Sequence, residues 1–280
     1  MISRSHRRCG GESKNSFTLV ENNNTGEVFD PTITTSVSTT LVWSSSNGYS
    51  TVTTGTTHDV SYTAPANGPR RWTITCAAGL SAIKTLDMNT DKLERIDISL
   101  LRSLAEARAY INASLSMSLR DLPIGLTYAS FFSDLLLTGD IADLPIGLTN
   151  AYLNNNSFLT AGSVSGLTKI TDLRVYSIGW DAESVDTVLL SISDAIHADP
   201  THFTYATPSL QIGGSNLAPG GTPAAATTSP LTTPGSGNSD SDWEWDAVAG
   251  KHKALTGMAA IWVMRNNTGH VWTVTATGVV

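Results

Sequence analysis

The sequence predicts a β-rich α/β fold: a short solenoid of stacked repeats, preceded by a small antiparallel β unit and closed by a helix and a strand. Three observations support this prediction. The peptide Asp-Leu-Pro-Ile-Gly-Leu-Thr occurs at 121–127 and again at 143–149, 22 residues later. Leucines recur at the same spacing, and strand-like runs precede the region where they do so. Repetition at this period indicates a stack of small units rather than one globule.

Two series of leucines run in phase through the repeats. The first steps by 22 residues and consists of Leu93, Leu115, Leu137 and Leu159. The second steps by 24, 22, 22 and 19 residues and consists of Leu80, Leu104, Leu126, Leu148 and Leu167. Two series in phase are harder to explain by chance than one repeated peptide. They indicate that each unit directs leucines to a shared core.

Within a unit, local chemistry predicts a strand, a turn and a return segment. The apolar residues Leu126, Ala129 and Phe131 begin a pattern that alternates like a short strand. The residue three positions later, Asp134 here and Asn156 in the next unit, is expected to turn the chain by bonding backbone groups inside the bend. The Leu-Pro pair of the return segment disfavours an α-helix. We therefore expect that segment to be extended or 3-10 helical.

These patterns resemble the leucine-rich repeats of bacterial and phage surface proteins, over residues 79–216. The stretch Leu137-Thr-Gly-Asp-Ile-Ala-Asp-Leu-Pro-Ile-Gly-Leu-Thr is similar to their unit, (L)TGDI(S/A)DLPxGLTxLxLxxN. Such arrays often follow a small β domain whose last strand resembles Trp72-Thr-Ile-Thr-Cys. The resemblance implies a leucine-rich-repeat solenoid. The chain departs from the family in its degenerate first units and in a long insertion after Pro219.

We expect five segments along the chain. They are a polar tail at 1–30, a small β unit at 31–78, the solenoid at 79–216, a low-complexity loop at 217–242 and a C-terminal cap at 243–280. An amphipathic helix is expected near 182–197, with Asp181 as its N-cap, because an open solenoid end must be covered. In the cap we expect a short helix at 257–264, and a strand at 271–276 that adds a last rung beside 210–212.

Composition argues against several classes of protein. The net charge is −7 and only 15% of residues are charged, which is unlike a nucleic-acid-binding protein. No apolar run reaches the roughly 18 residues of a membrane helix. The first ten residues carry three arginines but no apolar run follows, so we expect no secretion signal. Cys9 and Cys76 are interpreted as free thiols.

The motifs of common catalytic and metal sites are missing from the sequence. There is no H-x-x-x-H pair, no phosphate-binding loop and no G-x-S-x-G turn. His197 and His202 flank Asp199 and are interpreted as a solvated loop. The acidic residues Asp240, Asp242, Glu244 and Asp246 alternate as in a calcium loop, but Trp245 stands where such loops need glycine. We therefore predict no catalytic residue, no metal site and no cofactor.

Candidate binding residues lie in two places. In a solenoid, the strand positions that point outward line a continuous concave sheet, which is either a binding surface or an inert solvated face. Trp243 and Trp245 either contact a sugar or protein partner or pack back onto the cap. The candidates on the sheet are Tyr128, Tyr152, Asn154, Arg174 and Tyr176.

The favoured hypothesis is a non-enzymatic surface or virion protein, of the phage tail or capsid-surface type, located on a virion or an extracellular surface. Its expected partners are a protein or surface glycan together with other virion or surface subunits, with no nucleic acid and no membrane span. We expect a homo-oligomer or a part of a larger assembly. The alternatives are a purely structural subunit of a fibre or shell, and a glycan-cleaving enzyme. The enzyme would need two carboxylates about 5–10 Å apart across one groove.

Overall fold

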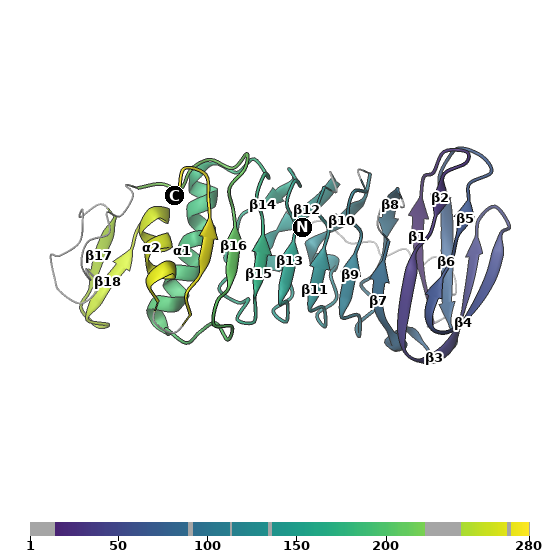
Figure 1. The fold of residues 1–280 in the computed structure, drawn as a ribbon, viewed down its shortest axis with the longest axis horizontal. Helices are drawn as coiled ribbons and strands as arrows, with labels where there is room; N and C mark the ends of the chain where they lie inside the picture. The colour runs from purple at the N-terminus through teal and green to yellow at the C-terminus, as the bar shows by residue number, and fades with distance from the viewer. Residues whose placement is uncertain are drawn as a thin grey trace, which may run out of the picture.

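The computed structural model describes residues 15–88, 92–112, 114–133, 136–221, 242–267 and 270–279. Its strands stack in one long row, with a β unit at one end and two helices at the other (Figure 1). The predicted fold class, a short β-rich leucine-repeat solenoid, is confirmed. The expectations for residues 1–14, Cys9, Asp134, Asp240 and most of the loop at 217–242 lie outside the described residues. No helix within the described ranges is long and apolar enough to cross a membrane.

One face of the solenoid is a row of parallel strands, here called the front sheet (Figure 1). In order they are β7 (Ile83–Asp87), β9 (Glu106–Arg108), β11 (Tyr128–Ser130), β13 (Asn150–Tyr152), β15 (Asp172–Arg174), β16 (Ser209–Gln211) and β19 (Thr273–Thr275). The middle residue of each short strand points into the core, as Ala129 and Leu173 do. The pairing of β19 with β16 is the last rung that the sequence predicts.

The opposite face, here called the back sheet, has four parallel strands. They are β8 (Leu93–Ile96), β10 (Ser116–Ser118), β12 (Leu136–Asp140) and β14 (Leu159–Thr160). From this face the chain turns back through the 3-10 helices η2 (Leu119–Asp121) and η3 (Ile141–Asp143), which confirms the expected return segment. Each is capped by a side chain, since Ser118 accepts from the amide of Arg120 and Asp140 from that of Ala142.

Both leucine series point into the core between the two sheets. Leu80, at 8% exposed, is the most exposed of the nine residues, and it belongs to the first, degenerate unit. Asn156 is fully buried, and its side-chain amide donates to the carbonyls of Phe131 and Leu153 at 2.6 and 2.8 Å. Asn156 thus turns the chain as predicted. Asn216 does the same after β16, where its side-chain amide donates to the carbonyls of Val175 and Ile212 at 2.9 and 2.7 Å.

The turns that follow β9, β11, β13 and β15 each contain one residue other than glycine in the left-handed backbone conformation. These residues are Ile111, Ser133, Asn155 and Ser177, with φ of 63°, 62°, 61° and 56°. Asparagine tolerates this conformation because its short polar side chain bonds locally, whereas a β-branched residue is strained in it. Ile111 is therefore the strained member of an otherwise suitable series.

The prediction of a polar tail over 1–30 is wrong for the residues that the structure describes. β1 (Ser16–Glu21) pairs antiparallel with both β6 (Arg70–Cys76) and β8. Phe17 and Leu19 are buried by the alternation of this strand. Glu21, which makes the segment look polar, is fully buried in an ion pair with Arg70 at 3.2 Å. Its partner lies 49 residues away, so no local pattern reveals it. Another strand, β2 (Val28–Phe29), pairs with β5 (Tyr62–Thr63).

The β unit and the solenoid share one sheet. The long strand β3 (Thr32–Ser45) pairs antiparallel with β6 along one half and with β7 along the other, and its register with β7 shifts between Thr34 and Thr35. β1 likewise continues the back sheet through β8. Both faces of the solenoid therefore run into the β unit, which covers the first rung. The outer strand β4 (Ser50–Asp59) pairs with β3.

The other end of the solenoid is covered by helices. The predicted helix is confirmed as α1 (Ala182–Ala198), and Asp181 caps it by accepting from the amide of Ser184. Its buried face carries Val185, Val188, Leu189, Ile192, Ser193 and Ile196. α2 (Gly257–Asn266) packs against α1, with the hairpin of β17 (Trp243–Asp246) and β18 (Lys251–Ala254) beside them (Figure 1).

Replacement of Ile111 by asparagine should stabilise the protein. The side chain is 54% exposed, so little burial is lost, while the strain of a β-branched residue at φ 63° is removed. We expect a gain of about 1 kcal/mol in the free energy of unfolding, measured by urea denaturation. The matched control is Asn155→Ile, two repeats later, which should lose a comparable amount. A neutral or destabilising Ile111→Asn would contradict this interpretation of the turns.

Candidate recognition face

The outward side chains of the front sheet form two straight rows, because strand residues alternate between faces and the parallel strands are in register. The row at the start of the strands runs through Glu106, Tyr128, Asn150 and Asp172. The row at their end runs through Arg108, Ser130, Tyr152 and Arg174. Each step along a row is 22 residues in the sequence. Residues that are 22 positions apart in the sequence therefore lie side by side on this face.

Four side chains meet in the centre of this array and form what we call the Arg–Tyr platform: Arg108, Tyr128, Tyr152 and Arg174. The two tyrosine rings meet edge to face, with centroids 5.5 Å apart and planes at 80°. The Arg174 guanidinium carbon lies 4.2 Å from the Tyr152 centroid, and that of Arg108 lies 4.8 Å from the Tyr128 centroid. Cation–π contacts of this kind favour the arrangement. The platform crosses four neighbouring strands.

Acidic side chains hold the two arginines in place. Asp172 Oδ2 accepts from Arg174 Nε at 2.9 Å and from Nη2 at 2.7 Å. This contact with Asp172 raises the pKa of Arg174. Glu106 pairs with Arg108 at 3.2 Å. Burial, followed by the nearby charge of Asp172, raises the pKa of the Tyr152 hydroxyl, so this group remains a neutral donor. The ion pairs and ring contacts thus hold the platform together within the chain itself.

A third row lies just beyond the strand ends. Tyr110 and Phe132 stack there, with centroids 4.5 Å apart and an interplanar angle of 10°. Asn154 and Tyr176 follow at the same 22-residue step, but Asn154 is only 4% exposed. The structure thus places all five predicted residues of the sheet on one face. It brings Tyr128, Tyr152 and Arg174 into contact and buries Asn154.

The sequence interpretation missed Arg108, Tyr110 and Phe132. The signal that finds them is the period itself, because Arg108 stands two repeats before Tyr152 and Tyr110 stands one repeat before Phe132. The first units are degenerate in their leucines, and this hides the continuation of the outward rows. If the outward positions are instead counted back in steps of 22 residues, the face extends by one strand, to β9.

The two candidate tryptophans do not join the face. Trp243 is 4% exposed, and its ring meets that of Trp262 with centroids 5.8 Å apart. Trp245 packs against His252 at 5.1 Å. Of the two expectations for this pair, packing onto the cap holds for Trp243, whose strand β17 lies at the helical end of the molecule (Figure 1). A buried ring offers no surface to a ligand, so Trp243 is removed from the candidate site.

Asp246, in the acidic stretch around these tryptophans, stabilises the turn of the β17–β18 hairpin. Asp246 accepts from the amides of Ala249 and Val248 and bonds His197 Nε2 at 3.0 Å, and these contacts lower its pKa to about 2. His197 is therefore engaged with the hairpin rather than lying in a solvated loop. In the part of the chain that the structure describes, no three His, Cys, Asp or Glu side chains gather as metal ligands would.

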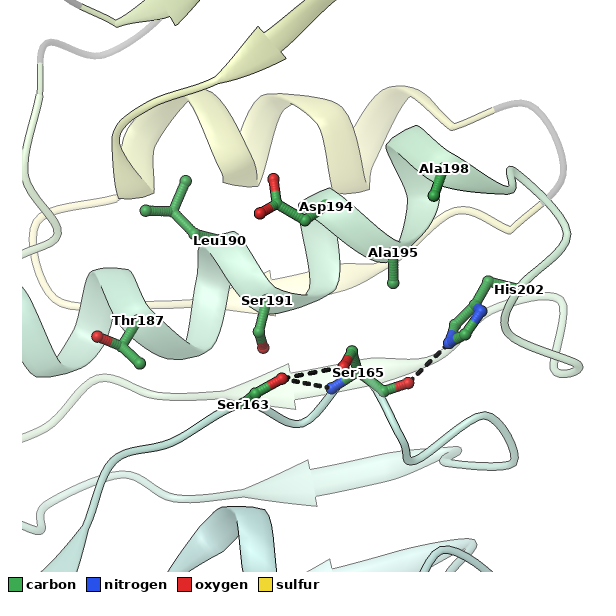
Figure 2. A pocket seen from close by; sticks show the side chains of 9 residues that line it. All are labelled: Ser163, Ser165, Thr187, Leu190, Ser191, Asp194, Ala195, Ala198 and His202. Carbon is green, nitrogen blue, oxygen red and sulfur yellow. Dashed lines mark hydrogen bonds between the residues drawn. The ribbon is translucent and has the colours of Figure 1, made fainter. Parts of the chain in front are cut away.

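A groove of about 570 Å³ lies beside α1 (Figure 2). Ser163 and Ser165 lie on one side of it, and Ser191 projects toward them from the helix (Figure 2). Ser191 donates to the Val188 carbonyl at 2.7 Å, and His202 Nε2 bonds the Ser165 carbonyl at 2.7 Å. The Ser191 hydroxyl and the His202 imidazole are thus both engaged with backbone carbonyls. The geometry gives a hydroxyl-lined groove without an activated nucleophile among its lining residues.

No protein-family model and no curated protein matches this chain. Among solved structures, it is similar to one described as the functional domain of InlJ from Listeria monocytogenes, which includes a cysteine ladder. The two are 18% identical, and the match covers 70% of this chain and 43% of the other at a TM-score of 0.31. The match therefore spans less than half of that protein's length. A TM-score this low carries no argument about function.

The contact between Tyr152 and Arg174 should be measurable as a coupling energy. In a double-mutant cycle of Tyr152→Leu and Arg174→Met, we expect about 0.5–1 kcal/mol of coupling in the free energy of unfolding, because a half-exposed cation–π contact is worth that much. Urea denaturation of the four proteins gives the value. Pairing Tyr152→Leu with Thr275→Val, two strands beyond Arg174, is the control and should be additive. Zero coupling in the first cycle would show that the contact is not maintained in solution.

Proposed function

We propose that this protein is a non-enzymatic surface or virion protein whose front sheet binds a protein or a surface glycan. One observation carries the proposal. The Arg–Tyr platform is half-exposed at the centre of the front sheet, and its two arginines are paired with Glu106 and Asp172. Tyrosine and arginine are enriched where binding energy concentrates. Side chains that are ordered beforehand lose less entropy on binding.

The chemistry of the face favours binding over glycan cleavage. A glycan-cleaving enzyme needs one carboxyl group as acid and another as base or nucleophile. On this face Asp172 is fixed by two hydrogen bonds from Arg174, and Glu106 is paired with Arg108. Carboxylates bound in this way support the arginines instead of facing a substrate across a groove. Tyrosine rings, in contrast, offer flat apolar surfaces for sugar rings or partner side chains.

A phage tail or capsid-surface location is the setting we propose for this activity, with other virion or surface subunits as neighbours. A second candidate function, a purely structural subunit of a fibre or shell, is favoured by β4. That strand is rich in threonine, carries no charge from Ser50 to Thr57, and pairs on one side with β3. Edge strands of this kind pair readily with another chain. The two candidates differ in which surface a partner covers.

The test is binding of labelled protein to an array of bacterial polysaccharides and to whole bacterial cells. Tyr128→Ser and Tyr152→Ser should each weaken binding at least about tenfold, because each removes a central aromatic contact. Gln211→Ala and Thr275→Ala, on the same face but beyond the platform, should bind like the wild type. Binding that all four variants retain would refute the front-sheet proposal. If the protein bound neither polysaccharides nor cells but formed a large assembly, and Val52→Lys in β4 dispersed that assembly, the structural candidate would be established.

A further inference from the structure

A second charged site lies on the β unit, away from the front sheet. β1 runs between β6 and β8, and Val20 is the register partner of Arg71 on one side and of Arg95 on the other. Cross-strand partners project from the same face of a sheet. Arg71 and Arg95 are therefore in one row with Val20 between them. All three strands lie at the end of the molecule opposite the helices (Figure 1).

The two arginines line one cavity of about 230 Å³. Thr18, Val20 and Asp97 also line it, so its wall combines cations, a hydroxyl group, an aliphatic side chain and a carboxylate. One water molecule accounts for about 30 Å³ of liquid, so the cavity suits one small ligand group rather than a peptide segment. A register shift immediately after Val20 displaces Glu94 from the ladder and brings Arg95 opposite Val20. Irregularities of this kind often redirect side chains at functional sites.

Neither guanidinium group is held by another side chain of the described residues, although the Asp97 carboxylate lines the same cavity. Among the described residues, Arg71 and Arg95 make no side-chain hydrogen bond and no ion pair, in contrast to other arginines of the chain: Arg70, Arg108, Arg120 and Arg174. Two nearby acids are otherwise engaged. Glu94 accepts from the side-chain amide of Asn22 at 2.6 Å, and Asp97 Oδ1 accepts from the Ser99 hydroxyl at 2.6 Å.

Arg71 and Arg95 lie on the strands either side of β1, roughly 10 Å apart at two strand spacings, so their long side chains can reach one ligand from both sides. A guanidinium group matches the two oxygens of a carboxylate and offers parallel hydrogen bonds to them. The remaining polar wall, Thr18 and Asp97, suits ligand hydroxyl groups, because both side chains accept hydrogen bonds from them.

We propose that this cavity binds an acidic sugar residue, with its carboxylate held between Arg71 and Arg95 and its hydroxyl groups directed to Thr18 and Asp97. The site is separate from the Arg–Tyr platform, since it lies on β1, β6 and β8 instead of the front sheet. A glycan bearing uronic-type residues is the ligand class that combines the required anion with the required hydroxyl donors. This proposal does not depend on the front sheet binding any ligand.

The test is a nuclear magnetic resonance titration of the full chain at low ionic strength, following the backbone amides of β1, β6 and β8. The probes are sodium glucuronate, glucose and sodium sulfate. Glucuronate should give saturable shifts with Kd near about 1 mM, a typical affinity for so small a ligand. Sulfate should bind more weakly because it lacks the sugar hydroxyl groups. Glucose, which lacks the anion, should give no saturable shift.

Variants assign the effect to the two arginines. Arg71→Gln and Arg95→Gln should each weaken glucuronate binding at least about tenfold, since each loses charged hydrogen bonds. Arg102→Gln removes an exposed arginine elsewhere and should bind like the wild type. Thermal unfolding confirms that each variant is folded. Absence of a saturable shift with glucuronate, or equal weakening by Arg102→Gln, would overturn the site. Sulfate binding as tight as glucuronate would overturn the sugar assignment.

Discussion

Every unit of this protein depends on the unit beside it. A front strand such as β11 or β13 is three residues long, far too short to hold together alone, and its inward residue is buried only because neighbouring strands flank it. The buried leucines and Asn156 bind each turn to the next. Because the units stack in register at a 22-residue period, any side chain at a given position stands directly beside its counterpart. Backbone pairing thus determines where the functional groups lie.

The same dependence explains both ends of the molecule. A stack leaves apolar side chains and unpaired strand edges at its first and last rung, and both must be covered. At the start, β3 and β1 extend the two sheets into the β unit. At the other end, α1 covers the core while β19 adds a rung to β16. The cap at the start has a second consequence, because it is the cap strand β1 that brings Arg71 and Arg95 into one row.

What the sequence predicts well is what depends on local or periodic chemistry. The inward leucines, the N-cap at Asp181 and the last rung at β19 follow from spacing, capping preference and alternation, which are properties of short stretches. The repeat period also predicts that Tyr128, Tyr152 and Arg174 share a face. Contact between their side chains, and the acids that hold the arginines, become visible only in the folded chain.

What the sequence does not predict depends on partners far away in the chain. β1 looks like a polar tail because Glu21 is charged, yet Arg70 neutralises it in the interior. Trp243 appears available until Trp262, from helix α2, covers it. The row of Arg71 and Arg95 exists only because β1, distant from both in sequence, is inserted between their strands. In each case the decisive interaction joins segments that no local pattern relates.

The central claim is that the β unit and the solenoid form one continuous stack, and native-state hydrogen exchange tests it most directly. The account predicts that amides in β1, β3, β7 and β11 exchange with similar free energies and respond together to added urea, because each strand is held by its neighbour. Exchange of the β1 and β3 amides at much lower free energy than those of β11, with no shared response to urea, would contradict it. The β unit would then be a separate domain, and the shared sheet would not govern the fold.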